Sequence, residues 1–403
     1  MSHDPVGSPI LNRSPTPPDD TASRPAWAAV WALALTVAML NTSEMLPGSL
    51  LTPMAASLGA SEGLIGQSVT ATAVLAIFTS LFVARITRRV DRRTVLLVVA
   101  AAQVASNLIV AAAPNTAAML GGRVLLGLTV GGVWGLSASL ALRLVPTQSV
   151  SRALSIIFGG GSVAMVAASP IGAFLGGVIG WHGVFYAAAG LSAVAVLALA
   201  MTLPPLPLQD GTSAAGLLPT LRLPGLLAGM GGVLLLFAGQ HNFITYMRPF
   251  LESISGFDTN GVAFVLLVFG AANFVGTMIA PYFLGHSLRF TLAGIAALEV
   301  VFLSLLWNFG TAQPVAVALV GLCGFALGGF GVGWSTWIAE KYPDHAEATG
   351  GILVATIQAG MMLGAMVGGG LINAVGAKGP ILASIVVFAI GAVHTVFALR
   401  SRP

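Results

Sequence analysis

Long apolar segments alternate with short polar loops along almost the whole chain. A membrane-spanning helix needs about 20 apolar residues to cross about 30 Å of hydrocarbon. Twelve segments meet this requirement, at residues 27–47, 64–86, 94–113, 117–141, 153–178, 183–203, 224–247, 261–284, 290–309, 314–338, 348–373 and 379–399. The pattern therefore predicts an all-α membrane protein with twelve transmembrane helices.

The remaining segments divide the chain into parts. Residues 1–26 are polar and Pro-rich, which predicts a disordered cytoplasmic tail. The longest loop between spans contains several prolines and covers residues 204–223. We therefore expect one six-helix bundle over residues 27–203, a cytoplasmic linker over 204–223 and a second six-helix bundle over 224–403.

Composition identifies the lipid bilayer as the main partner. The chain is 56% hydrophobic and 7% charged, whereas soluble domains are about 25% charged. The net charge of +4 does not indicate nucleic acid binding, because the basic residues lie in short loops between apolar segments. With the N-terminus inside, 14 of the 17 Lys and Arg residues fall on the cytoplasmic side. This asymmetry predicts a multi-pass protein of the bacterial inner membrane with both termini cytoplasmic.

The second half of the chain repeats the first. Residues 128–146 and 325–343 align without gaps at an offset of 197 residues, which pairs Gly131 with Gly328. Chance similarity between Gly-rich apolar helices is the alternative, but the repeat coincides with the division into six and six spans. We therefore predict two pseudo-symmetric six-helix bundles around a central cavity.

Glu44 is the most informative ionisable residue. A charged group within a span costs about 2.5–3.5 kcal/mol on insertion scales, so it indicates a functional site. Glu44 lies 17 residues after Trp27, about 26 Å along the helix and in its outer third. We predict that its carboxylate loads and releases the transported proton. The alternative is a structural acceptor near the helix end.

Arg123 lies at a similar depth in the fourth span, about 10 Å from the outer face. We predict that it interacts with Glu44, directly or through water, as the second proton-coupling residue. In the alternative, Arg123 extends to the outer headgroups. His241 on the seventh span is a further candidate for proton relay, although it could instead bind substrate or backbone.

Polar side chains within the spans are candidates for substrate binding. Trp134 offers an aromatic face, and polar groups within spans usually face the bundle interior. The candidates are Asn41, Gln67, Gln240, Asn242, Tyr246, Asn273 and Gln358. Contacts between helices are the alternative role for these residues.

Nucleotide and metal motifs are missing from the sequence. It has no P-loop, no dinucleotide-binding fingerprint and no metal-binding helix motif, and Cys323 is the single cysteine. We therefore expect a transporter without a cofactor, energised by the proton gradient, and not an enzyme.

Several motifs carry a resemblance to a known family. The loop Ala84–Arg93 corresponds to Gly-x-x-x-Asp-Arg-x-Gly-Arg-Arg, in which Arg89, Arg92 and Arg93 match and Asp91 stands near the missing acidic position. Arg123-x-x-x-Gly127 matches a second motif. Ser169-Pro170-x-Gly172 with Gly176-Gly177 is close to an exporter motif. The chain thus resembles the major facilitator superfamily, and the resemblance implies gating roles for Arg89, Asp91, Arg92, Arg93, Pro170 and Gly172.

Residues 44–55 and 61–70 resemble the drug:proton antiporter and sugar-efflux branch of this superfamily. Residues 137–146, 153–159, 237–240 and 332–337 are similar to purine ribonucleoside exporters within it. The resemblance implies a monomeric, proton-coupled exporter of small molecules that works by alternating access. Purine ribonucleosides and purine base analogues are the expected substrates, and sugars or hydrophobic drugs are the alternative. A membrane sensor is disfavoured because no soluble signalling segment is present.

Overall fold

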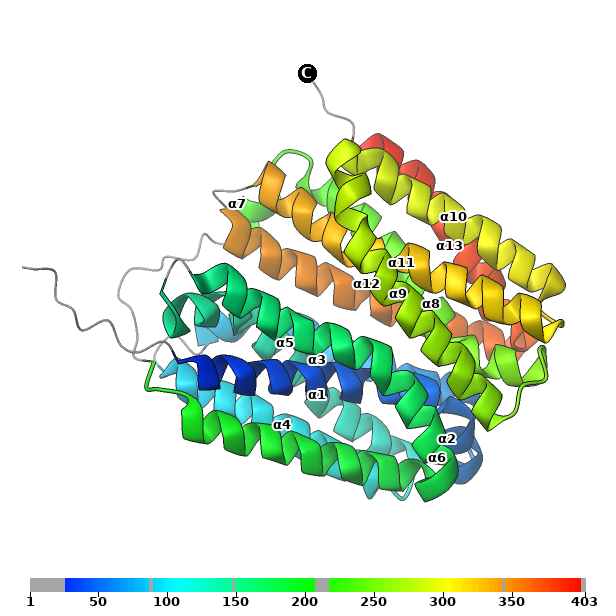
Figure 1. Ribbon diagram of the computed structural model, residues 1–403, viewed down its shortest axis with the longest axis horizontal. Helices are drawn as coiled ribbons and strands as arrows, with labels where there is room; N and C mark the ends of the chain where they lie inside the picture. Colours follow the sequence, from blue (N-terminus) through cyan, green and yellow to red (C-terminus); the bar gives the residue numbers. More distant parts are fainter. Residues whose placement is uncertain (1–25, 87–89, 147–148, 207–216, 343–344, 400–403) are drawn as a thin grey trace, which may run out of the picture.

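The computed structural model describes residues 26–86, 90–146, 149–206, 217–342 and 345–399, and these residues form thirteen helices. The helices are α1 (Trp27–Ser49), α2 (Leu51–Leu58), α3 (Glu62–Ile86), α4 (Arg92–Ala111), α5 (Thr116–Leu144), α6 (Val150–Thr202), α7 (Leu217–Leu221), α8 (Leu226–Ser253), α9 (Thr259–His286), α10 (Leu288–Phe309), α11 (Gln313–Lys341), α12 (Ala346–Val375) and α13 (Lys378–Ala398). Figure 1 shows two groups of helices, α1–α6 below and α8–α13 above. These groups are called the first half and the second half from here on.

The predicted twelve spans are present, although one helix contains two of them. Eleven of the described helices are long and apolar enough to cross a membrane. The longest, α6, has 53 residues and breaks at Gly180, where φ is 71° and ψ is 162°. An unbroken helix of this length would extend about 80 Å. The break therefore separates α6 into two arms: Gly160 and Gly172 of the first lie against α1, and Ser192 of the second accepts a hydrogen bond from Gln103 of α4.

Two short helices lie where the sequence predicted loops. Helix α2 follows α1 after a distortion at Leu50 and contains Pro53. Helix α7 lies in the segment 204–223, for which the sequence predicts a cytoplasmic linker. Both are too short to give a hydrophobic span signal, since they have eight and five residues.

The 197-residue offset applies to the whole fold. Shifting α5 by 197 residues reproduces the bounds of α11, and the same shift places α3 on α9 and α4 on α10 within a few residues. The packing repeats as well. A Cβ on Gly131 of α5 would overlap the carbonyl oxygen of Ala76 in α3, and a Cβ on Gly328 of α11 would overlap that of Asn273 in α9. Both pairs of partners are 197 residues apart, so the two halves are pseudo-symmetric.

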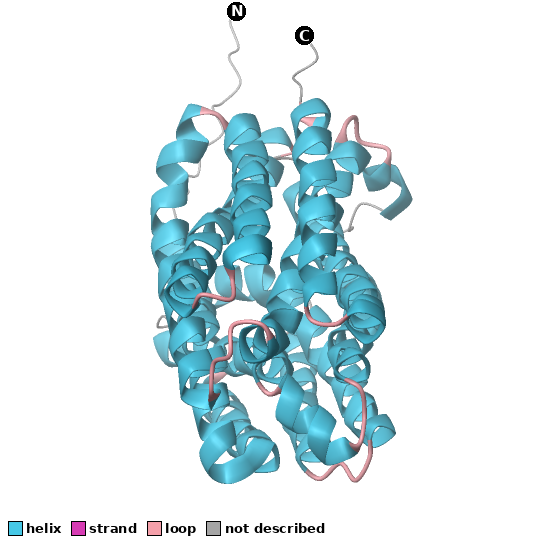
Figure 2. Cartoon of the chain, turned by 90° about the vertical axis from the view of Figure 1, so that its right-hand side faces the viewer, coloured by secondary structure: helices cyan, strands magenta, loops and turns pink. Residues whose placement is uncertain are grey.

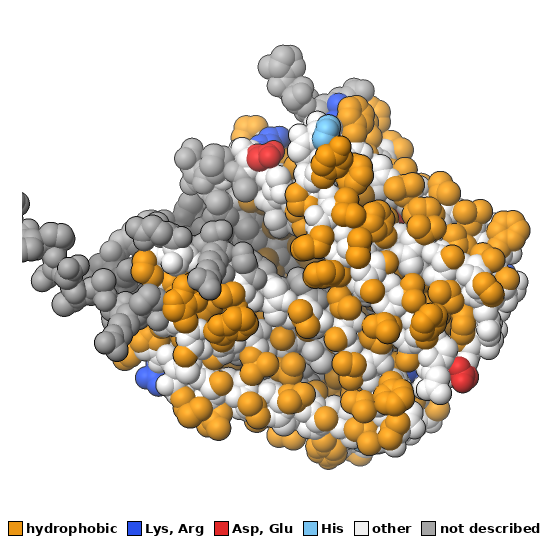
Figure 3. Space-filling view, in the orientation of Figure 1, with side chains coloured by type: hydrophobic (Ala, Val, Ile, Leu, Met, Phe, Trp, Pro, Cys, Tyr) orange, Lys and Arg blue, Asp and Glu red, His pale blue; other side chains and the backbone are white. Residues whose placement is uncertain are grey.

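The outer surface and the two ends of the bundle differ in composition. Figure 3 shows apolar side chains over the flank of the molecule and charged side chains near its ends. An even number of spans returns the chain to the end where it started, and Figure 2 shows the start of α1 and the end of α13 at the same end. We call this the termini end, and the opposite one, where α1 meets α2, the α2 end.

The halves meet most closely toward the α2 end. Helix α3 packs on α12, and the first arm of α6 packs on α9. A Cβ on Gly63 would overlap the carbonyl oxygen of Gly369, and Gly66 lies against the Tyr246 hydroxyl. Gln67 Nε2 also donates to the carbonyl of Ala365, at 3.2 Å, across the interface between the halves, which we call the seam. Glycines therefore allow backbone contact between the halves at this end.

Substitution of Gly180 tests whether the break in α6 depends on glycine. Its backbone lies in a region of φ and ψ that only glycine occupies without strain. We expect Gly180→Ala to destabilise the protein by about 1–3 kcal/mol and to lower its unfolding temperature in detergent. The matched control is Gly190→Ala, in the same helix and facing open space. That change should be neutral or stabilising, by up to about 1 kcal/mol. Equal unfolding temperatures for the two variants would contradict this account.

Candidate functional site

The environment of Glu44 begins with a proline in the same helix. Pro47 lies inside α1 and has no N–H, so the carbonyl of Ser43, four residues earlier, lacks its helical partner. Arg123 of α5 takes that place: Nη1 donates to the Ser43 carbonyl at 2.6 Å and Nη2 to the Glu44 carbonyl at 3.4 Å. Arg123 is fully buried, so it does not extend to the membrane surface, and the alternative role considered for it is wrong.

The Glu44 carboxylate lies between the halves. The charge of Arg123 attracts the Glu44 carboxylate. The two side chains form no direct ion pair, because the guanidinium is bound to backbone carbonyls. The Gln358 amide of α12 is the carboxylate's neighbour from the second half. That contact is loose, since Gln358 Nε2 has no hydrogen-bond partner of standard geometry among the described residues. The half-buried carboxylate thus has a neighbour on each side but no strong direct bond to either.

A buried polar network supports α1 behind Arg123. Asn107 of α4 donates through Nδ2 to Ser43 Oγ at 2.9 Å and to Ser192 Oγ at 3.3 Å. Gln103, one turn earlier, donates to the same Ser192 hydroxyl at 3.0 Å. This network is not among the sites predicted from the sequence, although two amides four residues apart in a span are a recognisable signal for one polar helix face. The network fixes the part of α1 that carries Glu44.

His241 is the pseudo-symmetric counterpart of Glu44, 197 residues later on α8. Its ring stacks on Phe237, with 6.4 Å between the ring centroids. His241 is 7% exposed, and its Nδ1 has no hydrogen-bond partner among the described residues. The neighbouring Gln240 is also buried, with an unpartnered Oε1. Of these two residues Gln240 lines a cavity between the halves, and relay by His241 stays a prediction.

Several predicted substrate residues are engaged between helices. Asn41 donates to a carbonyl of α6 at 3.2 Å, Asn242 to one of α13 at 2.9 Å, and Asn273 to one of α11 at 3.1 Å. The hydroxyl of Tyr246 donates to a carbonyl of α12 at 2.8 Å. Trp134 is half-buried and packs against the apolar core of the first half. In this conformation the donors of the three asparagines and the tyrosine hold helices together. Among the predicted substrate residues, the buried polar atoms without a hydrogen-bond partner in the described part of the chain are Asn242 Oδ1, Gln240 Oε1 and Gln358 Nε2.

The predicted gating residues lie at two places. Arg89 is outside the described residues. Asp91 caps α4 by accepting from the backbone N–H of Arg93 at 2.7 Å, and it also accepts from the N–H of Leu206 at 3.2 Å. Arg92 donates its N–H to the Leu206 carbonyl at 3.3 Å. This loop therefore holds the start of the connection between the halves, and its gating role stays a prediction.

The side chain of Arg93 continues this arrangement, because Nη2 donates to a carbonyl near the end of α6 at 2.8 Å. Pro170 and Gly172 lie in the first arm of α6 and are buried. A Cβ on Gly172 would lie 2.7 Å from Leu46 and 2.8 Å from Ser49. Gly172 thus permits the close approach of α6 to α1, next to the part of α1 that carries Glu44.

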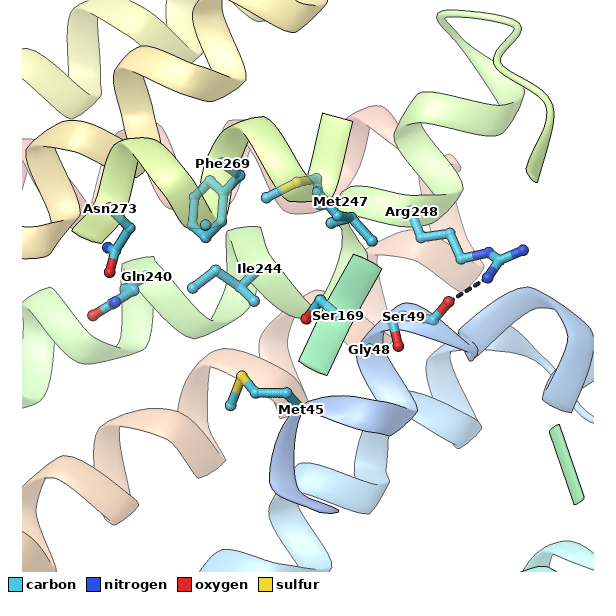
Figure 4. Close-up of a pocket in the computed structure, with 12 residues that line it drawn as sticks. Met45, Gly48, Ser49, Ser169, Gln240, Ile244, Met247, Arg248, Phe269 and Asn273 are labelled. Carbon is cyan, nitrogen blue, oxygen red and sulfur yellow. Dashed lines mark hydrogen bonds between the residues drawn. The ribbon is translucent and has the colours of Figure 1, made fainter. Parts of the chain in front are cut away.

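A small cavity lies between the halves near the site. Its walls come from α1, α6, α8 and α9, and they comprise Met45, Gly48, Ser49, Ser169, Gln240, Ile244, Met247, Arg248, Leu266, Phe269, Gly270 and Asn273. Figure 4 shows Gln240 and Asn273 at one side of it and Ser49 and Arg248 at the other. Its volume is about 30 Å³, which admits water but not a ligand that needs several hundred Å³. This cavity must widen before it can accept a nucleoside-sized molecule.

Residues 33–350 match the Major Facilitator Superfamily. The purine ribonucleoside efflux pump NepI of Salmonella paratyphi C is 45% identical over 365 residues, which is 91% of this chain and 92% of the pump. The pump of the same name from Salmonella enteritidis PT4 is 44% identical with the same coverage.

Solved structures agree on the fold. The nucleoside transporter NupG has a TM-score of 0.75 at 14% identity, with 93% of this chain and 100% of NupG covered. A bacterial homologue of the human lysosomal transporter Spinster also has a TM-score of 0.75, at 15% identity, with 94% and 97% covered. The twelve spans, the internal pseudo-symmetry and these matches together establish that this chain is a multi-pass membrane transporter that belongs to the major facilitator superfamily.

Proposed function

We propose that this protein exports purine ribonucleosides and purine base analogues across the bacterial inner membrane in exchange for protons. The cargo is supported by the 45% identity to proteins named purine ribonucleoside efflux pumps. The observation that carries the mechanism is the half-buried Glu44 carboxylate at the seam, with Arg123 on one side and Gln358 on the other. The termini end is the cytoplasmic end, by the distribution of basic residues.

Glu44 is the proton carrier in this proposal. An ionised carboxylate attracts the buried Arg123 charge, and protonation removes that attraction. Arg123 stays attached to α1 through the Ser43 carbonyl in either case. The change in charge therefore acts mainly on the loosely held neighbour from the other half, Gln358. Proton binding in this way alters the balance between the halves.

Transport follows from alternating access. The contacts at Gly63, Gly66 and Gln67 keep the seam closed toward the α2 end, which is the outer end in our orientation. Substrate enters from the cytoplasmic end, and rocking of the halves then opens the α2 end. The protein works as a monomer, without enzymatic activity and without a bound cofactor.

Glu44→Gln tests the proton step. The substitution keeps the size of the side chain and removes its charge, so we expect transport driven by an imposed pH gradient in proteoliposomes to fall to background. Counterflow exchange, which needs no gradient, should persist. The matched control is Glu340→Gln, an exposed carboxylate at the end of α11, which should behave as wild type. A Glu44→Gln protein with unchanged proton dependence would refute the assignment.

Substrate protection tests the cargo. Cells that overexpress the protein should survive higher concentrations of inosine and 6-mercaptopurine than cells that overexpress the Glu44→Gln variant. Arabinose analogues and hydrophobic dyes serve as the comparison. Protection against the dyes or the sugar analogues alone would exclude purine export and favour the alternative cargo.

A further inference from the structure

A cluster of polar residues at the α2 end connects the two halves. The first half supplies Ser49 and Thr52, and the second half supplies Arg248 and Glu252 near the end of α8. Arg248 Nη1 donates to the Ser49 carbonyl, and Thr52 Oγ1 donates to Glu252 Oε2 at 2.6 Å. Two adjacent hydrogen bonds thus cross the seam in opposite directions.

The Ser49 carbonyl is available because of Pro53. Pro53 lies four residues later in α2 and has no N–H, so the helical partner of this carbonyl is missing. Ser49 is also the last residue of α1, where the carbonyls of a helix carry partial negative charge. The Arg248 guanidinium of the other half supplies both the missing donor and a positive charge, and Figure 4 shows its bond to Ser49.

Arg248 and Glu252 form one unit on α8. Their side chains are one helical turn apart and are paired through Nε and Oε1 at 2.8 Å. Arg248 is 5% exposed and Glu252 is 23% exposed. Separation of the halves would leave this ion pair in place but would remove the acceptor of Arg248 Nη1, and a buried charged donor without an acceptor is costly. The unit therefore favours the arrangement in which the Ser49 carbonyl is within reach, which is the closed seam.

The Thr52 hydroxyl has a second acidic neighbour, Glu62, so a bond within one half can be compared with a bond between the halves. Its Oε1 lies 3.1 Å from the same Thr52 hydroxyl, but Glu62 belongs to the first half. A hydroxyl has one proton to donate, so Glu62 and Glu252 compete for it. When the halves separate, Glu62 stays beside Thr52 and Glu252 does not.

We propose that Arg248 and Glu252 are the latch of the outer gate: they hold the α2 end closed through the Ser49 carbonyl and the Thr52 hydroxyl, and release of both bonds opens the cavity to the outside. The proposal rests on the proposed function only for taking the α2 end as the outer end. The residues act in this proposal by positioning the halves.

Thiol labelling tests the latch without substrate and without a pH gradient. Cys323 is fully buried, and Cys323→Ala removes it. In that background, Ser169→Cys places one thiol in the wall of the cavity that Arg248 also lines. A membrane-impermeant maleimide then reports access from outside in intact cells and from inside in inverted vesicles. We expect Arg248→Gln to accelerate outside labelling by about tenfold, since one charged hydrogen bond is worth about that factor.

The sharper comparison uses two isosteric changes at one hydroxyl. Glu252→Gln weakens a bond between halves and should raise outside labelling while lowering inside labelling. Glu62→Gln weakens the competing acceptor within one half and leaves the bond to Glu252 in place, so it should leave outside labelling unchanged or make it slower. Pro53→Ala supplies a local N–H for Ser49 and leaves every latch side chain in place, so it should also raise outside labelling.

Each contrary result has a distinct meaning. Wild-type outside rates in both Arg248→Gln and Glu252→Gln would overturn the latch. Equal acceleration from both sides would indicate local unfolding and would also overturn it. A rise from the cytoplasmic side alone would overturn the outer assignment. Failure of purine export with a normal labelling response would instead refute the proposed cargo, so the two proposals are separable.

Discussion

Two prolines on one stretch of chain determine how the transporter is held together. Pro47 and Pro53 each remove a backbone N–H and leave a carbonyl without its helical partner, at Ser43 and at Ser49. An unpartnered carbonyl within a bilayer is costly. Both carbonyls are taken by an arginine, and the two arginines have different origins: Arg123 comes from the same half and Arg248 from the other half. The first bond fixes the internal structure of a bundle, and the second joins the bundles.

This arrangement explains how Glu44 can carry charge without being locked. A guanidinium that bound the carboxylate directly would hold it ionised and immobile. The Nη donors of Arg123 instead bind backbone carbonyls, so the Arg123 charge acts on Glu44 at a distance. The half-buried carboxylate therefore stays free to interact with water and with the second half. The Asn107 network behind Ser43 keeps α1 in position. A group that must gain and lose a proton in each cycle needs a fixed backbone and a free side chain, and both are present here.

The sequence predicted the parts of the fold that repeat or that depend on length. Apolar segment lengths predicted the twelve spans, and the 197-residue offset predicted the two halves, because both are properties of the chain itself. The sequence also placed Glu44 and Arg123 at a similar depth in the membrane. The sequence did not reveal that Arg123 binds carbonyls, since that depends on how α5 crosses α1 near Pro47. Nor did it reveal that Asn242 and Asn273 serve helix contacts within the second half, because a polar residue in a span shows the same pattern whether it faces a cavity or a neighbour.

Bonds of modest strength at the seam suit a gate better than extensive packing does. Between helices in a bilayer there is little hydrophobic driving force, so association depends on close packing and on hydrogen bonds. The contact of Gly63 with Gly369 supplies close packing, but it is non-directional and allows helices to slide or rock. The bonds of Arg248 and Thr52 are directional and define one closed position. Interhelical hydrogen bonds in membranes are worth about 0.6–2 kcal/mol each, so two of them bias the closed state by a few kcal/mol at most. A bias of that size keeps the gate shut in the resting molecule and is small enough for proton and substrate binding to reverse in each cycle.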